Sequence, residues 1–269
     1  MSKVVLITGG SSGLGKAMAE HLSQLGYRVF ATGRNPKQEV SRSYELIPMD
    51  VTKLETIRTA VDHIMQQCGR LDVLINNAGV GITGPVEETS LDAVRNTFET
   101  NYFGALAVMQ HVLPIMRKQS DGFIINITSI AGYMGLPFRA AYSASKSSLE
   151  LTTEALRMEL VGSGIKVVNV APGDFATNIA AGRYHAPLME GSPYATTYGR
   201  SLKTMNEHVD EGLDPVVMAR QVGRILQQPH PDVHYRVGSR LQRFSVWLKG
   251  VLPGKWYERL LMKHYGLKK

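Results

Sequence analysis

Tyr142 and Lys146 lie one helical turn apart in the segment AAYSASKSSLE, residues 140–150. If this segment is a helix, both side chains lie on one face, because residues four apart are neighbours there. A free tyrosine has a pKa of about 10 and is a poor base at neutral pH. A lysine cation beside it stabilises the tyrosinate, so such a pair could donate or accept a proton. Alone the pattern is weak, because ordinary helix surfaces also carry Tyr-x-x-x-Lys.

A glycine-rich turn, TGGSSGLG at residues 8–15, follows an apolar run and opens a segment with helical spacing. Backbone N–H groups of such a turn can approach a phosphate at a helix N-terminus, where the dipole favours an anion. Gly9, Gly13 and Gly15 follow the pattern G-x-x-x-G-x-G. This is neither the G-x-G-x-x-G pattern nor the G-x-x-x-x-G-K-[ST] phosphate loop. The glycines could simply permit a tight turn, but their position between strand and helix favours nucleotide binding.

The elements that must position these residues alternate along the chain. Strands are predicted at 3–8, 28–32, 44–50, 71–79, 122–129, 165–173 and 233–238, and helices at 13–25, 54–68, 91–118, 142–161 and 214–228. Strands that alternate with helices form βαβ units with right-handed crossovers. The pattern therefore predicts an α/β fold with a parallel sheet.

The size and composition of the chain are typical of one globular domain, residues 1–269, because 269 residues with 43% hydrophobic content can form a full core. Cys68 is the single cysteine, so an intrachain disulfide is excluded. The first apolar run is too short for a signal peptide or a membrane span, which favours a cytoplasmic location. Residues 174–213 show no regular pattern and are interpreted as a substrate-binding loop, with a surface connection as the alternative.

Several motifs, in this order, resemble the short-chain dehydrogenase/reductase family in its single-domain form. The turn at 8–15 is similar to the family's T-G-x-x-x-G-x-G motif, NNAG at 76–79 to the motif that ends its fourth strand, and PGDFAT at 172–177 to its P-G-x-x-x-T segment. The resemblance extends to about residue 238 and leaves the last thirty residues outside. It implies a doubly wound Rossmann fold with a predominantly parallel, roughly seven-stranded sheet flanked by helices. It also implies a homodimer or homotetramer.

The resemblance assigns the family's catalytic tetrad to Asn101, Ser129, Tyr142 and Lys146. Tyr142 would exchange a proton with the substrate, and Lys146 would also bond the nicotinamide ribose. Ser129, thirteen residues before Tyr142 at the end of a strand, would hold the substrate oxygen, and Asn101 would anchor a water in a proton relay. The implied activity is hydride transfer between a nicotinamide cofactor and a carbonyl or hydroxyl group.

The end of the second predicted strand discriminates between the two nicotinamide cofactors. A carboxylate there would bond the ribose of NAD and repel a 2′-phosphate, but this strand is followed by Arg34 and no acid. Because a guanidinium can pair with a phosphate, the sequence favours NADP(H); alternatively, Arg34 is a solvated turn residue. The predicted cofactor-binding residues are Gly9, Ser11, Ser12, Gly13, Leu14, Gly15, Arg34, Asp50, Val51, Asn77, Ala78, Gly79, Tyr142, Lys146, Pro172, Gly173 and Thr177.

The residues that follow Ser129 and Gly173 are mostly apolar, which favours a hydrophobic ketone, aldehyde or alcohol over a sugar. Steroid, retinoid, sphingoid and long-chain acyl substrates all fit. Each apolar residue taken alone could equally be core packing. The predicted substrate contacts are Ser129, Met134, Leu136, Tyr142, Phe175, His185 and Met189.

The C-terminal extension, residues 239–269, is basic and amphipathic. From residue 236 onward the chain has nine Lys or Arg and one acid, a charge of +8, whereas the whole chain carries +7. Pro253-Gly254 should divide the extension into two short helices. It could dock peripherally on a membrane, cap the pocket or form a subunit interface. A nucleic-acid partner is not expected, because no binding motif accompanies the charge.

Two other classes of function fit the sequence less well. Ser12 lies near a G-x-S-x-G pattern, but the second glycine comes one residue early and the turn follows the first strand, which disfavours a serine hydrolase. The histidines are scattered and Cys68 is isolated, so no metal site is predicted. The remaining alternative is a non-catalytic NADP(H)-binding sensor or scaffold on the same fold. The intact tetrad residues disfavour it.

Overall fold

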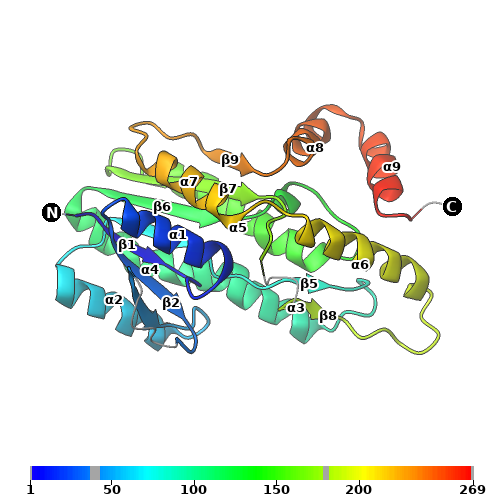
Figure 1. Cartoon of the computed structure of the whole chain (residues 1–269), viewed down its shortest axis with the longest axis horizontal. Coiled ribbons are helices and arrows are strands. Elements are labelled where there is room, and N and C mark those ends of the chain that lie inside the picture. Colours follow the sequence, from blue (N-terminus) through cyan, green and yellow to red (C-terminus); the bar gives the residue numbers. More distant parts are fainter. Residues whose placement is uncertain (1, 37–42, 178–181, 268–269) are drawn as a thin grey trace.

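The seven predicted strands form one all-parallel sheet in the order β3-β2-β1-β4-β6-β7-β9 (Figure 1). The computed structural model describes residues 2–36, 43–177 and 182–267. The strands are β1 (Val4–Ile7), β2 (Arg28–Gly33), β3 (Glu45–Pro48), β4 (Val73–Asn76), β6 (Gly122–Ile127), β7 (Ile165–Pro172) and β9 (His234–Val237). The order reverses direction at β1, where open α/β sheets bind their ligands. The predicted α/β fold with a parallel, seven-stranded sheet is confirmed.

Helices cover both faces of the sheet, so the core has two layers (Figure 1). They are α1 (Gly13–Gln24), α2 (Leu54–Cys68), α3 (Leu91–Phe98), α4 (Gly104–Gln119), α5 (Ala140–Glu159) and α7 (Pro215–Leu226). Val4 and Leu6 pack with α2, α4 and α5, whereas Val5 and Ile7 pack with α1 and α7. Because successive strand residues point to opposite faces, burial of both faces requires the continuous apolar runs seen in the sequence.

The helix predicted at 91–118 is continuous but not uniform. A π-helical turn, η1 (Glu99–Phe103), lies between α3 and α4 and includes Asn101. Such turns contain one wider i→i+5 step and often mark functional sites. The apolar spacing over residues 91–118 predicted one uninterrupted helix and did not mark this extra residue.

Residues 174–213 were expected to be irregular, and this expectation is wrong in part. The segment contains a 16-residue helix, α6 (Ala195–Asp210), and a two-residue strand, β8 (Tyr184–His185). Strand β8 pairs in parallel with β5 (Ile82–Thr83), which directly follows the NNAG motif. The loop is therefore attached to the chain beside the predicted site.

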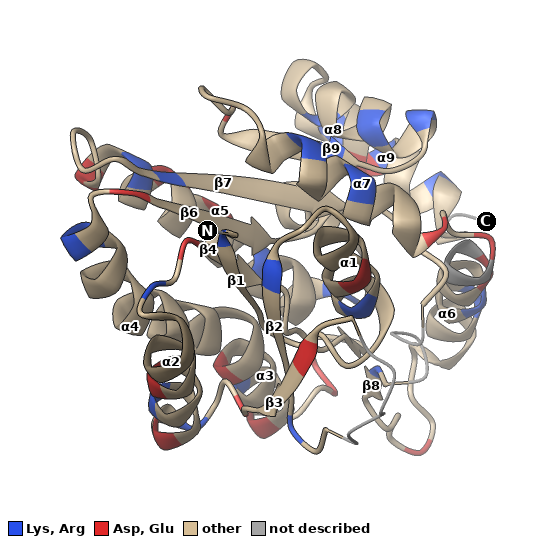
Figure 2. Cartoon of the chain, turned by 60° about the vertical axis from the view of Figure 1, so that its left-hand side comes forward, with Lys and Arg blue, Asp and Glu red and all other residues tan. Residues whose placement is uncertain are grey.

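The C-terminal extension forms two helices, α8 (Arg240–Val251) and α9 (Gly254–His264), which confirms the predicted break at Pro253-Gly254. Val246 and Tyr257 pack against Ile130 and Met134, in and beside the short 3₁₀ turn η2 (Ile130–Tyr133). Lysines and arginines recur along both helices (Figure 2). Among the described residues, no helix is both long and apolar enough to cross a bilayer.

Candidate active site

The glycine turn and the NNAG motif meet at the reversal point of the sheet, after β1 and β4. The Thr8 hydroxyl accepts hydrogen bonds from the backbone N–H groups of Asn77 and Ala78, both at 2.9 Å. The Asn77 amide in turn donates to the backbone oxygens of Thr8 and Gly9, both at 3.0 Å. These four bonds fix the two motifs to each other.

The turn leaves no room for side chains at several of its glycines. A Cβ atom at Gly15 would lie 2.2 Å from the Gly9 oxygen and 2.6 Å from the Asn77 amide nitrogen, and one at Gly10 would lie 2.5 Å from the Ala31 methyl group. Gly9 also has φ +66°, in the left-handed region that favours glycine. Helix α1 begins just beyond, and the Ser12 hydroxyl makes no capping hydrogen bond. A bare backbone at a helix N-terminus fits the diphosphate of a dinucleotide.

Tyr142 and Lys146 lie on the buried face of α5, and only 6% and 4% of their surfaces are exposed. The Lys146 ammonium donates a hydrogen bond to the backbone oxygen of Ile127, the last residue of β6, at 3.0 Å. A Cβ atom at Gly79 would lie 3.3 Å from this ammonium and 3.3 Å from the Asn101 oxygen. Three predicted site residues therefore converge at the ends of β4 and β6.

Lys146 is a buried cation. Burial lowers the pKa of Lys146, while the negative charges of an ionised Tyr142 and of Glu150 act in the opposite direction. Glu150 lies one helical turn further along α5 and accepts a hydrogen bond from the Thr128 hydroxyl at 2.9 Å. Burial raises the pKa of Glu150 to about 7, although hydrogen bonds from Thr128 and Tyr133 act against it. Sequence reasoning missed this carboxyl, although its spacing from Lys146 repeats the Tyr142–Lys146 spacing.

Asn101 is 1% exposed and its amide is fully engaged with protein groups. Its oxygen accepts from the Val80 N–H at 2.8 Å, and its nitrogen donates to the Val80 oxygen at 3.0 Å and to the Ser145 hydroxyl at 3.1 Å. These bonds hold the chain after NNAG against α5. Asn101 therefore positions the segment that leads into β5.

Ser129 lies where β6 ends, as predicted, and is the N-cap of η2. Its hydroxyl accepts a hydrogen bond from the Ala131 N–H at 3.1 Å, and 8% of its surface is exposed. Ala131 packs in one apolar cluster with Tyr142 and Ile82. The segment that starts at Ser129 therefore borders the tyrosine.

The residues predicted to hold the adenosine end lie around the ends of β2 and β3. The side chain of Ser11 lies 3.1 Å from the position of a Cβ atom at Gly33, and Arg34 follows directly with an exposed side chain. Burial alone would raise the pKa of Asp50, but hydrogen bonds from Thr52 and the charges of Lys53 and Arg34 keep it below its usual range. Arg34 and Asp50 are thus close enough to interact electrostatically.

The remaining predicted cofactor residues are distributed more widely. Val51 packs against Gly104 at the start of α4, where a Cβ atom would lie 2.7 Å from its side chain. Thr177 lies 3.5 Å from the position of a Cβ atom at Gly13, so the PGDFAT segment borders the glycine turn. Gly173 faces Gln242 of α8.

The predicted substrate residues have different surroundings. Leu136 packs in the apolar cluster that contains Tyr142, whereas Phe175 is buried in the core below α1 and α7. The Met134 sulfur accepts a hydrogen bond from the Tyr257 hydroxyl of α9 at 2.7 Å. His185 is exposed and its Nδ1 lies 3.2 Å from the Thr83 hydroxyl, and Met189 is 59% exposed. The structure groups Leu136 with Tyr142, and Met134 with the C-terminal extension.

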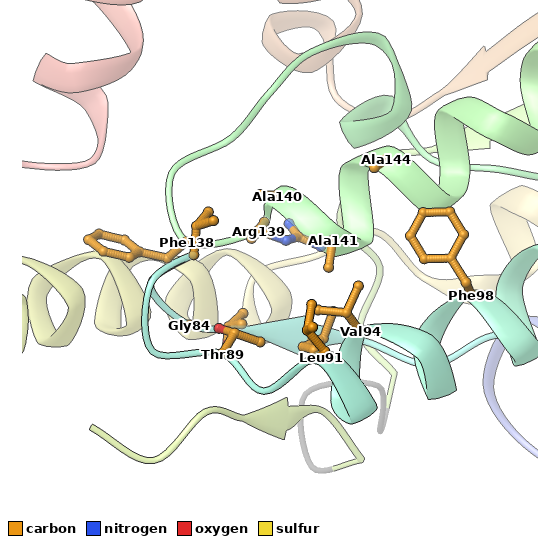
Figure 3. A pocket seen from close by; sticks show the side chains of 13 residues that line it. Gly84, Thr89, Leu91, Val94, Phe98, Phe138, Arg139, Ala140, Ala141 and Ala144 are labelled. Atoms are coloured by element: carbon orange, nitrogen blue, oxygen red, sulfur yellow. The ribbon is translucent and has the colours of Figure 1, made fainter. Parts of the chain in front are cut away.

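A pocket of about 330 Å³ adjoins the site between α3, β5 and α5 (Figure 3). Its walls include Phe98 and Phe138, together with Ala140 and Ala144 of α5. At helical spacing, these alanines lie on the opposite face of α5 from Tyr142. Ile82 and Arg139, which contact the Tyr142 ring, also line the pocket, so it borders the tyrosine from the side of α3.

Comparison with known proteins agrees with this geometry. The model of the short chain dehydrogenase family matches residues 3–187. The chain belongs to the short-chain dehydrogenase/reductase family. It is 38% identical over 267 residues to a 3-ketodihydrosphingosine reductase from Bacteroides thetaiotaomicron, covering 99% of each protein.

Two solved structures extend the comparison. A short-chain dehydrogenase from Streptomyces avermitilis has a TM-score of 0.82 at 31% identity, with 99% of each chain covered. The structure of ElxO with NADP bound has a TM-score of 0.72 at 27% identity, with 89% of this chain and 97% of that chain covered. Membership of the family implies an NAD(P)(H) cofactor, which exchanges hydride with the substrate when bound. The glycine turn described above fits such a cofactor.

Proposed function

We propose that this short-chain dehydrogenase/reductase is an NADP(H)-dependent oxidoreductase that acts on the carbonyl or hydroxyl group of a hydrophobic substrate. The observation that carries the proposal is the pairing of Tyr142 and Lys146 on the buried face of α5, with Lys146 bonded to the end of β6. A lysine ammonium one helical turn from a buried tyrosine hydroxyl is an arrangement suited to proton exchange with a bound substrate.

The other tetrad residues are assigned roles that their positions support. Tyr142 donates its proton to the carbonyl oxygen in reduction and accepts it in oxidation. Ser129, which is bonded to Ala131 of the apolar cluster that contains Tyr142, holds that oxygen through its hydroxyl. Asn101 positions the Val80 segment and, through Ser145, the start of α5. Such preorganised groups lower the barrier because they need no rearrangement during the reaction.

A lipid-like ketone is the proposed substrate class. The cluster beside Tyr142 is apolar, and the relative from Bacteroides thetaiotaomicron is described as a 3-ketodihydrosphingosine reductase. Sphingoid, steroid, retinoid and other long-chain ketones or aldehydes should be screened with NADPH oxidation as the readout. If none is reduced while NADPH still binds, the alternative of a non-catalytic sensor or scaffold replaces this proposal.

Arg34→Asp should reverse the preference for NADPH over NADH. The carboxylate would repel the 2′-phosphate and could bond the 2′-hydroxyl of NADH, at a position beside Ser11 and Asp50. We expect kcat/KM with NADPH to fall by about 10- to 100-fold, the loss of one or two charge-assisted hydrogen bonds. Steady-state kinetics with both cofactors tests this, and Arg58→Asp, at an exposed position on α2, is the control. An unchanged cofactor ratio would show that Arg34 does not read the phosphate.

Self-association as a homodimer or homotetramer is the proposed quaternary state. Leu91 of α3 and Leu151 and Met158 of α5 expose most of their surfaces, and the pocket of Figure 3 opens between these helices. Exposed apolar side chains on neighbouring helices are typical of subunit interfaces.

A further inference from the structure

Two arginines that sequence reasoning did not single out lie beside Tyr142. The guanidinium carbon of Arg139 lies 4.6 Å from the centre of the Tyr142 ring. Arg183 directly precedes β8 and is 7% exposed. Its Cγ lies 3.2 Å from the position of a Cβ atom at Gly81, two residues after NNAG. The pairing of β5 with β8 therefore brings Arg183 to the site from a distant part of the chain.

The two cations are close enough to repel each other. Burial lowers the pKa of Arg183, and the charge of Arg139 lowers it further, whereas Asp174 acts in the opposite direction. Asp174 also accepts a hydrogen bond from the Gln242 amide at 2.6 Å. One carboxylate offsets only one of two guanidinium groups, so the pair retains a net positive charge next to the tyrosine.

The hydrogen-bonding capacity of the pair is only partly used within the described chain. The Nε of Arg139 is buried and has no hydrogen-bond partner among the described residues. One nitrogen of Arg183 donates to the Asn206 oxygen at 3.2 Å, but a guanidinium has five N–H donors. Buried cations are costly unless anionic or polar acceptors complete their shells.

We propose that Arg139 and Arg183 form an anion-binding subsite for a carboxylate or phosphate that the substrate carries near its ketone. The subsite rests on the proposed reductase function and narrows it to anionic lipid-like ketones. Arginine suits this role because its planar fork binds both oxyanions with two parallel hydrogen bonds. An anion there would offset the excess charge and place the carbonyl next to Tyr142.

Ketone pairs that differ in one anionic group test the subsite. One pair is a long-chain 3-oxo acid and its methyl ester; the other is the phosphate monoester of a long-chain 1-hydroxy-2-ketone and its free alcohol. We expect kcat/KM to be about tenfold or more higher for the charged member of one pair, as for one charge-assisted hydrogen bond. The pair whose charged member is preferred shows whether the subsite binds a carboxylate or a phosphate.

Variants locate the effect. Arg183→Gln and Arg139→Gln should each lower kcat/KM for the charged member more than for the neutral member, so that the preference for the charged member disappears. Arg183→Lys should retain part of the preference, because it keeps the charge and loses the fork. Arg200→Gln, an exposed arginine of α6, is the matched control and should change nothing.

Binding is measured separately, with NADPH present, by calorimetric titration of octyl phosphate, octanoate and 1-octanol. If no ketone is reduced but one anion binds wild type about tenfold more tightly than Arg183→Gln, the subsite stands and the reductase function fails. The subsite is overturned if Arg183→Gln lowers kcat/KM equally for both members of each ketone pair. It is also overturned if this variant raises only the KM for NADPH.

A second, independent observation concerns α8, which has an apolar side toward solvent. Leu241, Phe244, Trp247 and Val251 recur at spacings of three and four residues and are 71%, 50%, 55% and 54% exposed. The opposite side holds Val246, which is 5% exposed. A surface helix normally has one apolar stripe and buries it, whereas α8 buries Val246 and exposes a second stripe.

Helix α9 presents a mixed surface. Trp256 and Leu260 are 63% and 49% exposed, and Lys255, Arg259 and Lys263 form an exposed basic row at four-residue spacing beside them. The chain from residue 236 onward carries +8, and the basic residues of α8 and α9 are seen in Figure 2. Exposed aromatic residues next to basic residues are typical of helices that lie in the interface of an anionic bilayer.

We infer that α8 and α9 dock on an anionic phospholipid surface. The docked helices would hold the site at that surface, because Val246 and Tyr257 pack against Ile130 and Met134. A lipid-like substrate could then pass from the bilayer to the segment after Ser129 with little exposure to water. Docking does not depend on which ketone is reduced.

The two tryptophans of the chain, Trp247 and Trp256, both lie in these helices and report docking directly. Their fluorescence should shift to shorter wavelength with phosphatidylcholine vesicles that contain phosphatidylglycerol, and the chain should float with them. The shift and the flotation should fall with added salt. Without phosphatidylglycerol we expect about tenfold less recovery, because the basic row then has no partner.

The double variant Phe244→Gln/Leu241→Gln keeps both tryptophans and should lose most flotation, whereas Val161→Gln, an exposed site after α5, should not. Equal recovery of all three proteins would reject docking. Conversion of a wild-type oligomer to monomers by the double variant would instead identify a subunit interface and also reject it.

Discussion

Tyr142→Phe should lower kcat/KM for ketone reduction by about 10²- to 10⁴-fold, the usual contribution of a positioned proton donor. The change removes one oxygen and keeps the ring, which packs against Ile82 and Ala131 below Arg139. Without the hydroxyl, no proton reaches the developing alkoxide from this position. Stopped-flow or steady-state NADPH oxidation measures the loss, and fluorescence titration should show nearly unchanged NADPH affinity.

Tyr235→Phe is the matched control for this variant. The Tyr235 hydroxyl bonds the backbone N–H of Asp232 and the Gln228 side chain at the end of α7, which do not contact the tetrad. We expect activity close to wild type. Turnover by Tyr142→Phe within about threefold of wild type would show that another group supplies the proton, since that factor is below the range of general acid catalysis.

Gly15→Ala should weaken NADPH binding and destabilise the fold. The added methyl group would meet the Gly9 oxygen, the Asn77 amide and the Gly10 Cα within 2.9 Å. Two of these atoms are backbone, and the third holds the turn to β1 through its bonds to Thr8 and Gly9. Overpacking of this kind costs about 1–3 kcal/mol. We expect a lower melting temperature and NADPH affinity reduced by about tenfold or more, because the turn must open.

Gly199→Ala separates this effect from the general effect of adding a methyl group. Gly199 lies in α6 with nothing within 4 Å of the added atom, and alanine there should stabilise the helix by about 0.5–1 kcal/mol. Differential scanning fluorimetry with and without NADPH compares the two variants. If Gly15→Ala melts and binds NADPH as wild type does, the close approach at this turn has no role in binding.

Local patterns in the sequence predicted the sheet and the main site motifs. The strands are mainly apolar because helices cover both faces, and alternate residues of β1 enter the two core layers as expected. The turn, NNAG, Ser129 and the α5 pair follow directly after strands or within one helix. Because all strands are parallel, their C-terminal ends meet at one edge, and the motifs come together.

Features that depend on distant pairing were not predictable. Arg183 reaches the site because β8 pairs with β5 about a hundred residues away, and no local pattern marks a two-residue strand. Helix α6 was missed because threonine and glycine weaken its helical signal. The core position of Phe175 follows from the bridge of its backbone to Leu213, which the spacing of apolar residues does not reveal.

The π-helical turn at Glu99–Phe103 places a constraint on chain length at this point. Its extra residue rotates α4 by about 100° relative to an uninterrupted α-helix. Val108 and Val112, fully buried in the core, depend on that rotation, and Asn101 sits inside the turn. Deleting a single residue here would turn the amide away from Val80 and the valines away from the sheet together. Length variation among related chains should therefore accumulate in the surface loops, while the number of residues between β5 and β6 stays fixed.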